Sequence, residues 1–149
     1  MKIFVSLLTF LCLSLFTYAQ TINYQLIKSE KTSSSTVKLT LMVYSKSKKT
    51  IDADAQYAAI KTVLFDGCPD TPYNKPLLDS GEATSFEQYP SYFDNFYNYR
   101  IGDFILNCLP ASSFKKGDKA KGTLYEVQVK VLLLRKDLEK NGIINKMGI

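Results

Sequence analysis

Histidine is absent from the 149 residues of this chain. It is the commonest general base in enzymes and the commonest zinc ligand, so its absence excludes Ser-His and Cys-His nucleophile arrangements. The chain also lacks a glycine-rich phosphate loop, and its few cysteines do not have the spacing of a zinc site. We therefore predict no catalytic residue, no cofactor, no metal site and a protein that is not an enzyme.

Two groups of acidic residues come nearest to a reactive site. Asp52 and Asp54 have the spacing of a metal-binding Asp-x-Asp pair, but acids at the start of a helix show the same pattern, because they cap free amides and face the positive end of the helix dipole. Asp79, Glu82 and Glu87 could supply a carboxylate pair for glycoside hydrolysis. Nothing in the sequence distinguishes an acid from a base among them, so a small hydrolase is the last of three alternatives.

A long apolar run occurs once, over residues 3–16, with a lysine before it. Thr17 and Ala19 follow it and place small residues at the two positions that a signal peptidase reads. This pattern predicts a signal peptide over residues 1–19, cleaved after Ala19. The alternative, an uncleaved anchor, requires about 20 apolar residues. We expect a single domain over residues 20–149, periplasmic or secreted, with no transmembrane span after cleavage.

Cysteine is also scarce. Cys12 leaves with the predicted signal peptide, and Cys68 and Cys108 remain. A pair of cysteines in an oxidising compartment favours one disulfide, which would contribute about 4 kcal/mol in the chain-entropy model. The alternative is two buried thiols that pack as small apolar side chains. The sequence leaves both open.

Basic residues outnumber acidic ones by 19 to 14, and they are unevenly distributed. Residues 28–49 hold six lysines and one acid, residues 50–104 hold nine acids and three bases, and residues 105–149 hold nine bases and four acids. If the two basic segments contain neighbouring strands, their outward faces and loops form a positive surface. From the sequence alone we favour another interpretation, in which these lysines keep exposed strands and loops soluble and do not form a binding surface.

Alternating apolar residues predict the strands. Residues 123–134 carry apolar side chains at every second position, from Tyr125 to Leu133. Such spacing gives a strand one apolar face and one wet face. Residues 21–27 and 36–45 alternate in the same way and predict a hairpin, and residues 100–106 predict a fourth strand.

A three- and four-residue spacing predicts the helices. Residues 53–66 form an amphipathic helix that ends at Gly67, and a proline-rich loop follows over residues 69–83. Seven aromatic residues crowd residues 84–99, with a short helix beginning near Tyr89. A lysine-rich loop covers residues 110–122. After residue 134 we expect a short helix capped by Gly142, with Ile143 folding back on Leu138.

These elements predict a two-layer α+β domain. Its sheet is mainly antiparallel, with about four strands, and the 53–66 helix and the aromatic helix cover one face. The strings AIKTVLFDG, PLL, YFDNFYNY, RIGDF and VKVLLLRKDLEKNGI, from about Asp52 onward, resemble a group of small exported proteins of Bacteroidota. The resemblance implies this fold and an envelope protein, and it transfers no catalytic residue.

The leading hypothesis is a non-enzymatic interaction module that binds another envelope or surface protein. The alternative is a module for an anionic or carbohydrate polymer, which would use lysine-rich strands and exposed tyrosines. Helical spacing favours core packing for most of the aromatic residues. Nucleic acid is disfavoured because the basic residues are not interleaved with aromatic ones and the chain carries an export signal. The candidate binding surface comprises Tyr73, Tyr89, Tyr92, Tyr97, Tyr99, Lys115, Lys116 and Lys119.

Overall fold

The computed structural model describes residues 21–116 and 121–146. Four strands form one antiparallel sheet in the order β1-β2-β4-β3. The strands are β1 (Asn23–Lys31), β2 (Val37–Tyr44), β3 (Ile105–Pro110) and β4 (Thr123–Val129). The helical elements are α1 (Ile51–Lys61), the π-helical turn η1 (Thr62–Asp66), α2 (Glu82–Gln88), α3 (Pro90–Asn95), the π-helical turn η2 (Phe96–Arg100), the 3₁₀ turn η3 (Ile101–Phe104) and α4 (Val131–Lys140).

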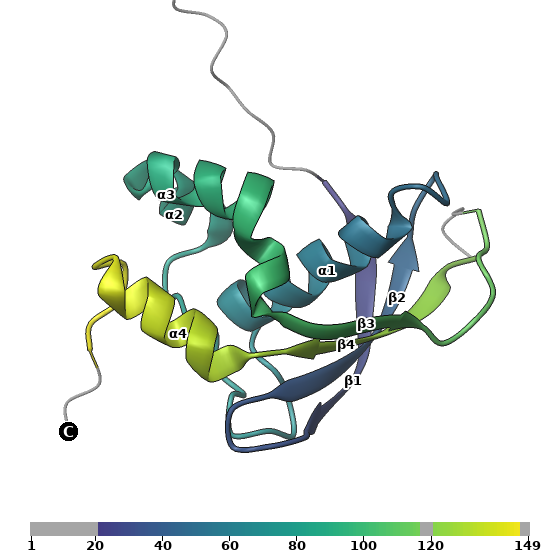
Figure 1. The fold of residues 1–149 in the computed structure, drawn as a ribbon, viewed down its shortest axis with the longest axis horizontal. Helices are drawn as coiled ribbons and strands as arrows, with labels where there is room; N and C mark the ends of the chain where they lie inside the picture. The colour runs from purple at the N-terminus through teal and green to yellow at the C-terminus, as the bar shows by residue number, and fades with distance from the viewer. Residues whose placement is uncertain (1–20, 117–120, 147–149) are drawn as a thin grey trace, which may run out of the picture.

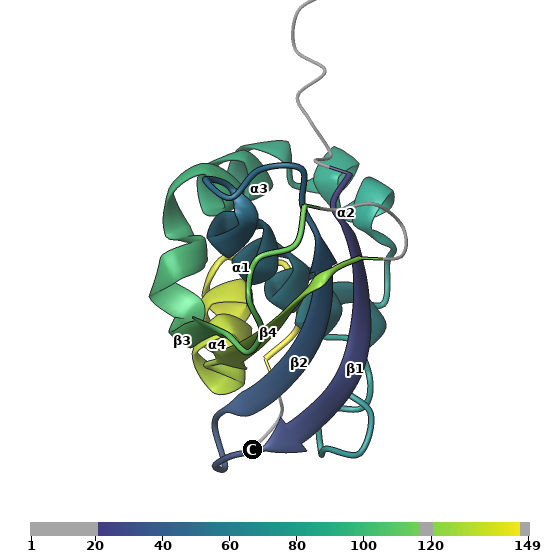
Figure 2. The same ribbon diagram turned by 90° about the vertical axis from the view of Figure 1, so that its right-hand side faces the viewer.

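The helices pack on one face of the sheet (Figure 1). In the perpendicular view, β1 and β2 lie in front of α1 (Figure 2). The predicted α+β fold, with an antiparallel four-stranded sheet covered on one face, is therefore confirmed. The predicted signal peptide lies outside the described residues. None of the helices in the described ranges is long and apolar enough to cross a bilayer.

The buried face of the sheet follows the alternation seen in the sequence. Every second residue of β2, from Val37 to Val43, is fully buried, and so are Val127 and Val129 of β4. Leu39 pairs with Val127 across the two strands, which places both apolar sets on the same face. Burial of this face against helices is the main source of stability for the domain.

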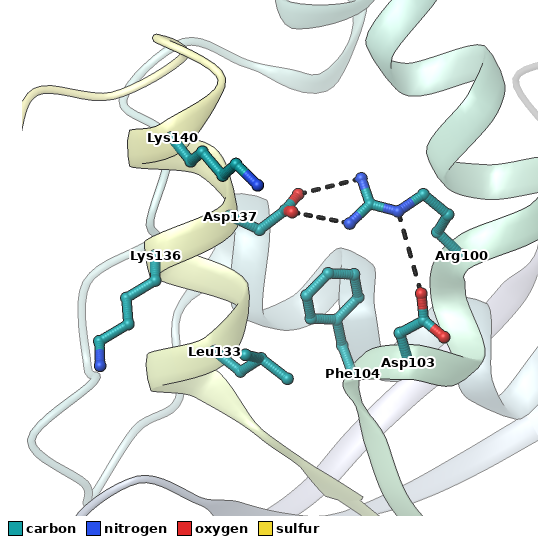
Figure 3. Close-up of a pocket in the computed structure, with 7 residues that line it drawn as sticks. All are labelled: Arg100, Asp103, Phe104, Leu133, Lys136, Asp137 and Lys140. Carbon is teal, nitrogen blue, oxygen red and sulfur yellow. Dashed lines mark hydrogen bonds and ion pairs between the residues drawn. The ribbon is translucent and has the colours of Figure 1, made fainter.

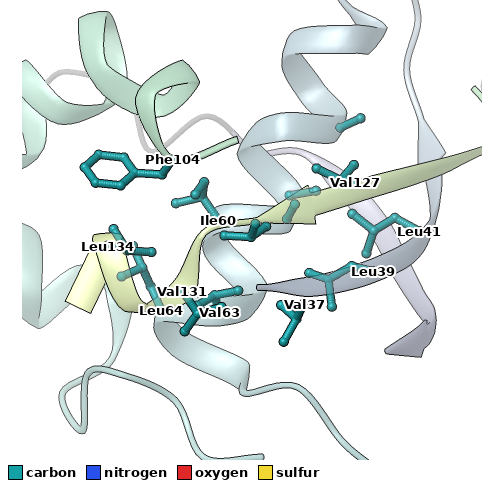
Figure 4. Packing of buried hydrophobic residues seen from close by; sticks show 14 of the residues in the cluster. Val37, Leu39, Leu41, Ile60, Val63, Leu64, Phe104, Val127, Val131 and Leu134 are labelled. Carbon is teal, nitrogen blue, oxygen red and sulfur yellow. The ribbon is translucent and has the colours of Figure 1, made fainter. Parts of the chain in front are cut away.

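Helix α1 covers that face. Ala55, Ala58 and Ala59 are fully buried, and small side chains at these positions let the helix approach the sheet closely. Figure 4 shows Ile60 and Val63 gathered with the side chains of the sheet. The predicted 53–66 helix is confirmed as α1 followed by η1, and it ends at Gly67, whose φ is +84°.

The opposite face of the sheet is polar over much of its area. Lys38, near the start of β2, lies 3.2 Å from a carboxylate oxygen of Glu30 on β1 and 3.7 Å from one of Glu126 on β4. Such exposed ion pairs add little to the stability of the fold, because solvent screens them. Salt bridges therefore offset part of the lysine charge along the strands.

The prediction of a strand over residues 100–106 is wrong in its position. The chain stays helical through η2 and η3, and β3 begins only at Ile105. The reason is aromatic docking: the ring of Phe104 stacks on Phe96 with centroids 5.4 Å apart, and the guanidinium of Arg100 lies 5.6 Å from the Phe104 centroid. These contacts require the helical turn and shift the strand by several residues.

The prediction that the central strand continues to residue 134 is also wrong. β4 ends at Val129, and α4 begins at Val131. Val129 pairs with Val37, the first residue of β2, so a longer β4 would extend beyond its partner strand. As a helix the same run buries Leu134 and leaves Leu133 47% exposed. The predicted cap is confirmed: Gly142 has a φ of +71°, and the Ile143 amide donates to the Leu138 carbonyl at 2.9 Å.

Candidate interaction surfaces

The eight residues proposed from the sequence as a binding surface do not come together. The Tyr73 hydroxyl donates to the Ser34 carbonyl at 2.6 Å, at the turn before β2 begins. The Lys115 amide donates to the Thr123 hydroxyl at 2.9 Å, and Thr123 pairs with Val43 near the other end of β2. Tyr73 and Lys115 therefore lie at opposite ends of the sheet. Lys119 lies outside the described residues.

Most of the aromatic stretch belongs to the core, so its tyrosines do not form the predicted surface. The Tyr97 ring packs 4.6 Å from that of Tyr57, and its buried hydroxyl has no hydrogen-bond partner among the described residues. Burial raises the pKa of the Tyr97 hydroxyl well above its usual range. Tyr89 is half-buried against the core, whereas Tyr99 is 80% exposed.

The acidic residues considered for catalysis or metal binding have separate surroundings. Glu82 accepts a hydrogen bond from the Tyr57 hydroxyl at 3.1 Å and forms an ion pair with Lys61. Asp79 and Glu87 are exposed. Asp52 accepts a hydrogen bond from the Tyr125 hydroxyl. Across residues 21–116 and 121–146, no three His, Cys, Asp or Glu side chains converge as metal ligands would.

The two cysteines of the predicted mature chain are free thiols in the structure. Cys68 is fully buried, whereas Cys108 is half-buried, with its thiol 3.9 Å from the Asp52 carbonyl oxygen. Burial raises the pKa of Cys68 to about 12 and that of Cys108 to about 11. The two thiols are unbonded in the structure, and whether the protein forms the disulfide stays a prediction.

One end of the sheet is strongly basic. Val43 near the end of β2 pairs with Thr123 at the start of β4, so the loop after β2 and the loop before β4 meet there. Figures 1 and 2 both show these loops at the same end of the molecule. The two basic segments of the sequence are therefore neighbours. We define the lysine end by the exposed lysines of these loops: Lys46, Lys48, Lys49, Lys115, Lys116 and Lys121.

The lysine end has little internal neutralisation. None of its six lysines forms an ion pair with another described residue. Asp52, at the start of α1 beside this end, accepts a hydrogen bond from Tyr125. A group of unpaired cations on adjacent loops produces a positive potential that attracts anionic partners. The sequence predicted a positive surface only on the condition that the two basic segments are neighbours, and the pairing of β2 with β4 brings their loops to the same end.

A second surface is the groove between α4 and the η2–η3 turns (Figure 3). It has a volume of about 350 Å³. We call it the α4 groove. It is lined by Arg100, Asp103, Phe104, Leu133, Lys136, Asp137 and Lys140. No pattern in the sequence indicates this groove, because its two walls, residues 100–104 and 133–140, are far apart in the chain and meet only in the fold.

An ion pair closes one part of the α4 groove. Arg100 donates from Nη2 to Oδ1 of Asp137 at 2.7 Å and from Nη1 to Oδ2 at 3.3 Å, and the Tyr92 hydroxyl donates to Oδ2 at 2.7 Å. Burial alone would raise the pKa of Asp137, but the hydrogen bonds from Arg100 and Tyr92 outweigh it and lower that pKa. The charge of Asp137 is thus compensated within the protein.

These features define a class of protein: an α+β domain with one helix-covered antiparallel sheet and two exposed basic surfaces. No family model, no curated protein and no solved structure matches the chain. The resemblance to exported proteins of Bacteroidota therefore stays a prediction.

Proposed function

We propose that this chain is an exported, non-enzymatic interaction module that binds an acidic partner protein of the cell envelope through the lysine end. The observation that carries the proposal is the set of six exposed lysines, none paired with a described acid, that two neighbouring loops bring to one end of the sheet. The predicted signal peptide supports an envelope location.

The form of the lysine end suits a partner with an extended acidic surface. Lysine is a flexible point charge that holds anions without fixed geometry, in contrast to the bidentate arginine fork. Charges of this kind accelerate encounter and select partners of opposite sign, and their effect falls with salt. Binding at the lysine end should therefore be fast and salt-sensitive.

An anionic polymer is the second candidate, because the six lysines are spread over two loops and can follow a charged chain. The two candidates differ in how binding depends on length. A specific acidic protein gives a saturable complex of fixed stoichiometry. A polymer gives an affinity that increases with the number of charged repeats it offers.

The test is affinity capture from native envelopes with three forms of the chain. The first is wild type, and the second carries Lys115→Glu and Lys116→Glu. The third carries Lys31→Glu and Lys75→Glu, two exposed lysines outside both surfaces, as a control with the same change in net charge. Wild type and control should recover the same proteins, and the Lys115/Lys116 variant should lose them.

Three outcomes would count against the proposal. Recovery of nothing by wild type would sink it, and so would equal recovery by all three forms. The third outcome is that wild type recovers no protein but binds alginate oligomers, with an affinity that increases with oligomer length. This result would favour the polymer instead.

A further inference from the structure

We propose that the α4 groove docks an extended acidic peptide segment of a partner protein, with one apolar side chain of the peptide against Leu133 and its carboxylates at Lys136 and Lys140. This site is separate from the lysine end. The lysine end adjoins Thr123 at the start of β4, and α4 begins two residues after Val129 at the other end of that strand.

The first support is the spacing along α4. Leu133, Lys136 and Lys140 stand at positions i, i+3 and i+7, which share one side of a helix. All three line the groove, and Figure 3 shows them with Phe104 and Arg100 on the facing wall. Leu133 is 47% exposed, so its side chain is accessible to a ligand. Leu133 thus shares one side of α4 with two lysines.

The second support is the charge balance of the groove. Asp137 is held by Arg100 and Tyr92, so this pair is internally neutral. Asp103 is the other acid of the lining, and its carboxylate lies 3.9 Å from Nε of Arg100. Lys136 and Lys140 are exposed and form no ion pair within 4 Å of a described carboxylate, although the charge of Lys140 helps to lower the pKa of Asp137. The α4 wall therefore presents an excess of positive charge, which carboxylates complement.

The size and openness of the groove favour a peptide over other anions. A volume of about 350 Å³ accommodates one large side chain and adjoining backbone. An acyl chain would need an enclosed apolar cavity, whereas this lining includes the Arg100–Asp137 ion pair. An acidic polysaccharide has no apolar side chain to cover Leu133. An acidic peptide with one leucine supplies both groups that the groove can hold.

The experiment is an amide NMR titration of the whole chain with the acetylated and amidated pentapeptide Glu-Asp-Leu-Glu-Asp. We expect shift changes confined to η3 and α4, and a dissociation constant in the range of about 0.1 to 1 mM, as a short exposed contact gives. A peptide with serine in place of leucine should bind several-fold more weakly, and a peptide with lysines in place of the acids should not bind.

Variants of the chain complete the test. Lys136→Glu with Lys140→Glu should weaken binding at least tenfold. The neutral pair K136Q/K140Q removes the two charges without reversing them on the helix, and it should weaken binding severalfold. Leu133→Ser should also weaken it, whereas K115E/K116E should retain it. Since the lysine end and the groove are altered separately, failure of one proposal is distinguishable from failure of the other.

The proposal is overturned by shift changes centred on the lysine end, by equal binding to K136E/K140E and wild type, or by no binding at millimolar peptide. Vesicles of phosphatidylglycerol serve as the lipid probe. Binding to these vesicles that K136E/K140E abolishes, in the absence of peptide binding, would assign the groove to an anionic lipid and likewise overturn it.

Discussion

Arg100 holds the carboxylate of Asp137 across the space between η2 and α4, with Nη2 2.7 Å from Oδ1. The ion pair joins the aromatic helices to the C-terminal helix, 37 residues later in the chain. Tyr92 donates to the same carboxylate from α3, so three elements meet at one acid. Removing Asp137 would leave a guanidinium and a phenol without their common partner.

Asp137→Asn should therefore destabilise the fold by about 2 kcal/mol at pH 7, as expected for hydrogen bonds to a charged group. Because the folded state lowers the pKa of Asp137, its contribution is fully present above the unfolded pKa and disappears as the pH falls through the folded value. Urea unfolding from pH 7 to pH 2.5 should show the difference between wild type and variant shrinking below about pH 4. A constant difference across that range would contradict this account.

The junction between β4 and α4 can be tested with two adjacent leucines. Leu134 is fully buried and Leu133 is 47% exposed. Leu134→Ala should cost about 2–5 kcal/mol, and Leu133→Ala about 0.5 kcal/mol, in the free energy of unfolding measured with urea. The reverse order of the two values would show that the strand continues past Val129 and that α4 does not begin at Val131.

Gly67 should be irreplaceable at the end of η1. Its φ is +84°, and an added Cβ would lie 2.5 Å from the backbone oxygen of Asn74. Gly67→Ala should therefore cost at least about 2 kcal/mol, because backbone strain and a backbone clash add. Gly81 has nothing within 4 Å of a built Cβ, so Gly81→Ala is the matched control and should change stability by less than about 1 kcal/mol. Thermal unfolding of both variants measures this, and equal effects would refute the conformation assigned to Gly67.

The two thiols should differ in reactivity. With Cys12→Ser, two free thiols should titrate in guanidinium chloride without a reductant. In the native protein at pH 8, Cys108 should react first with a disulfide reagent, since Cys68 is fully buried and its pKa is about 12. Absence of free thiols in the unfolded protein would instead demonstrate the disulfide, and faster modification of Cys68 would refute its burial.

The sequence could predict the features that depend on local periodicity. Alternation in β2 and in residues 123–129, the helix of α1, and the positive-φ glycines at Gly67 and Gly142 were predicted correctly, because each is a property of neighbouring residues. The single apolar stripe expected for that helix was wrong, because Ala53 is exposed and Tyr57 to Ile60 are all buried. The prediction for residues 131–134 was also wrong, because a run of four apolar residues fits a strand and a helix equally well. The difference is tertiary: the ladder of paired residues between β2 and β4 ends at Val37 and Val129, and beyond it Leu134 is buried from a helix.

By itself the sequence determined the class of the fold and an uneven distribution of charge, since both depend on which residues stand close along the chain. The tertiary structure decided where that charge gathers: the pairing of β2 with β4 brings Lys46 and Lys121 to one end of the sheet. It also decided which aromatic rings are core, and it created the α4 groove from Arg100 and Asp137. These features depend on contacts between residues far apart in the chain, which local spacing does not encode.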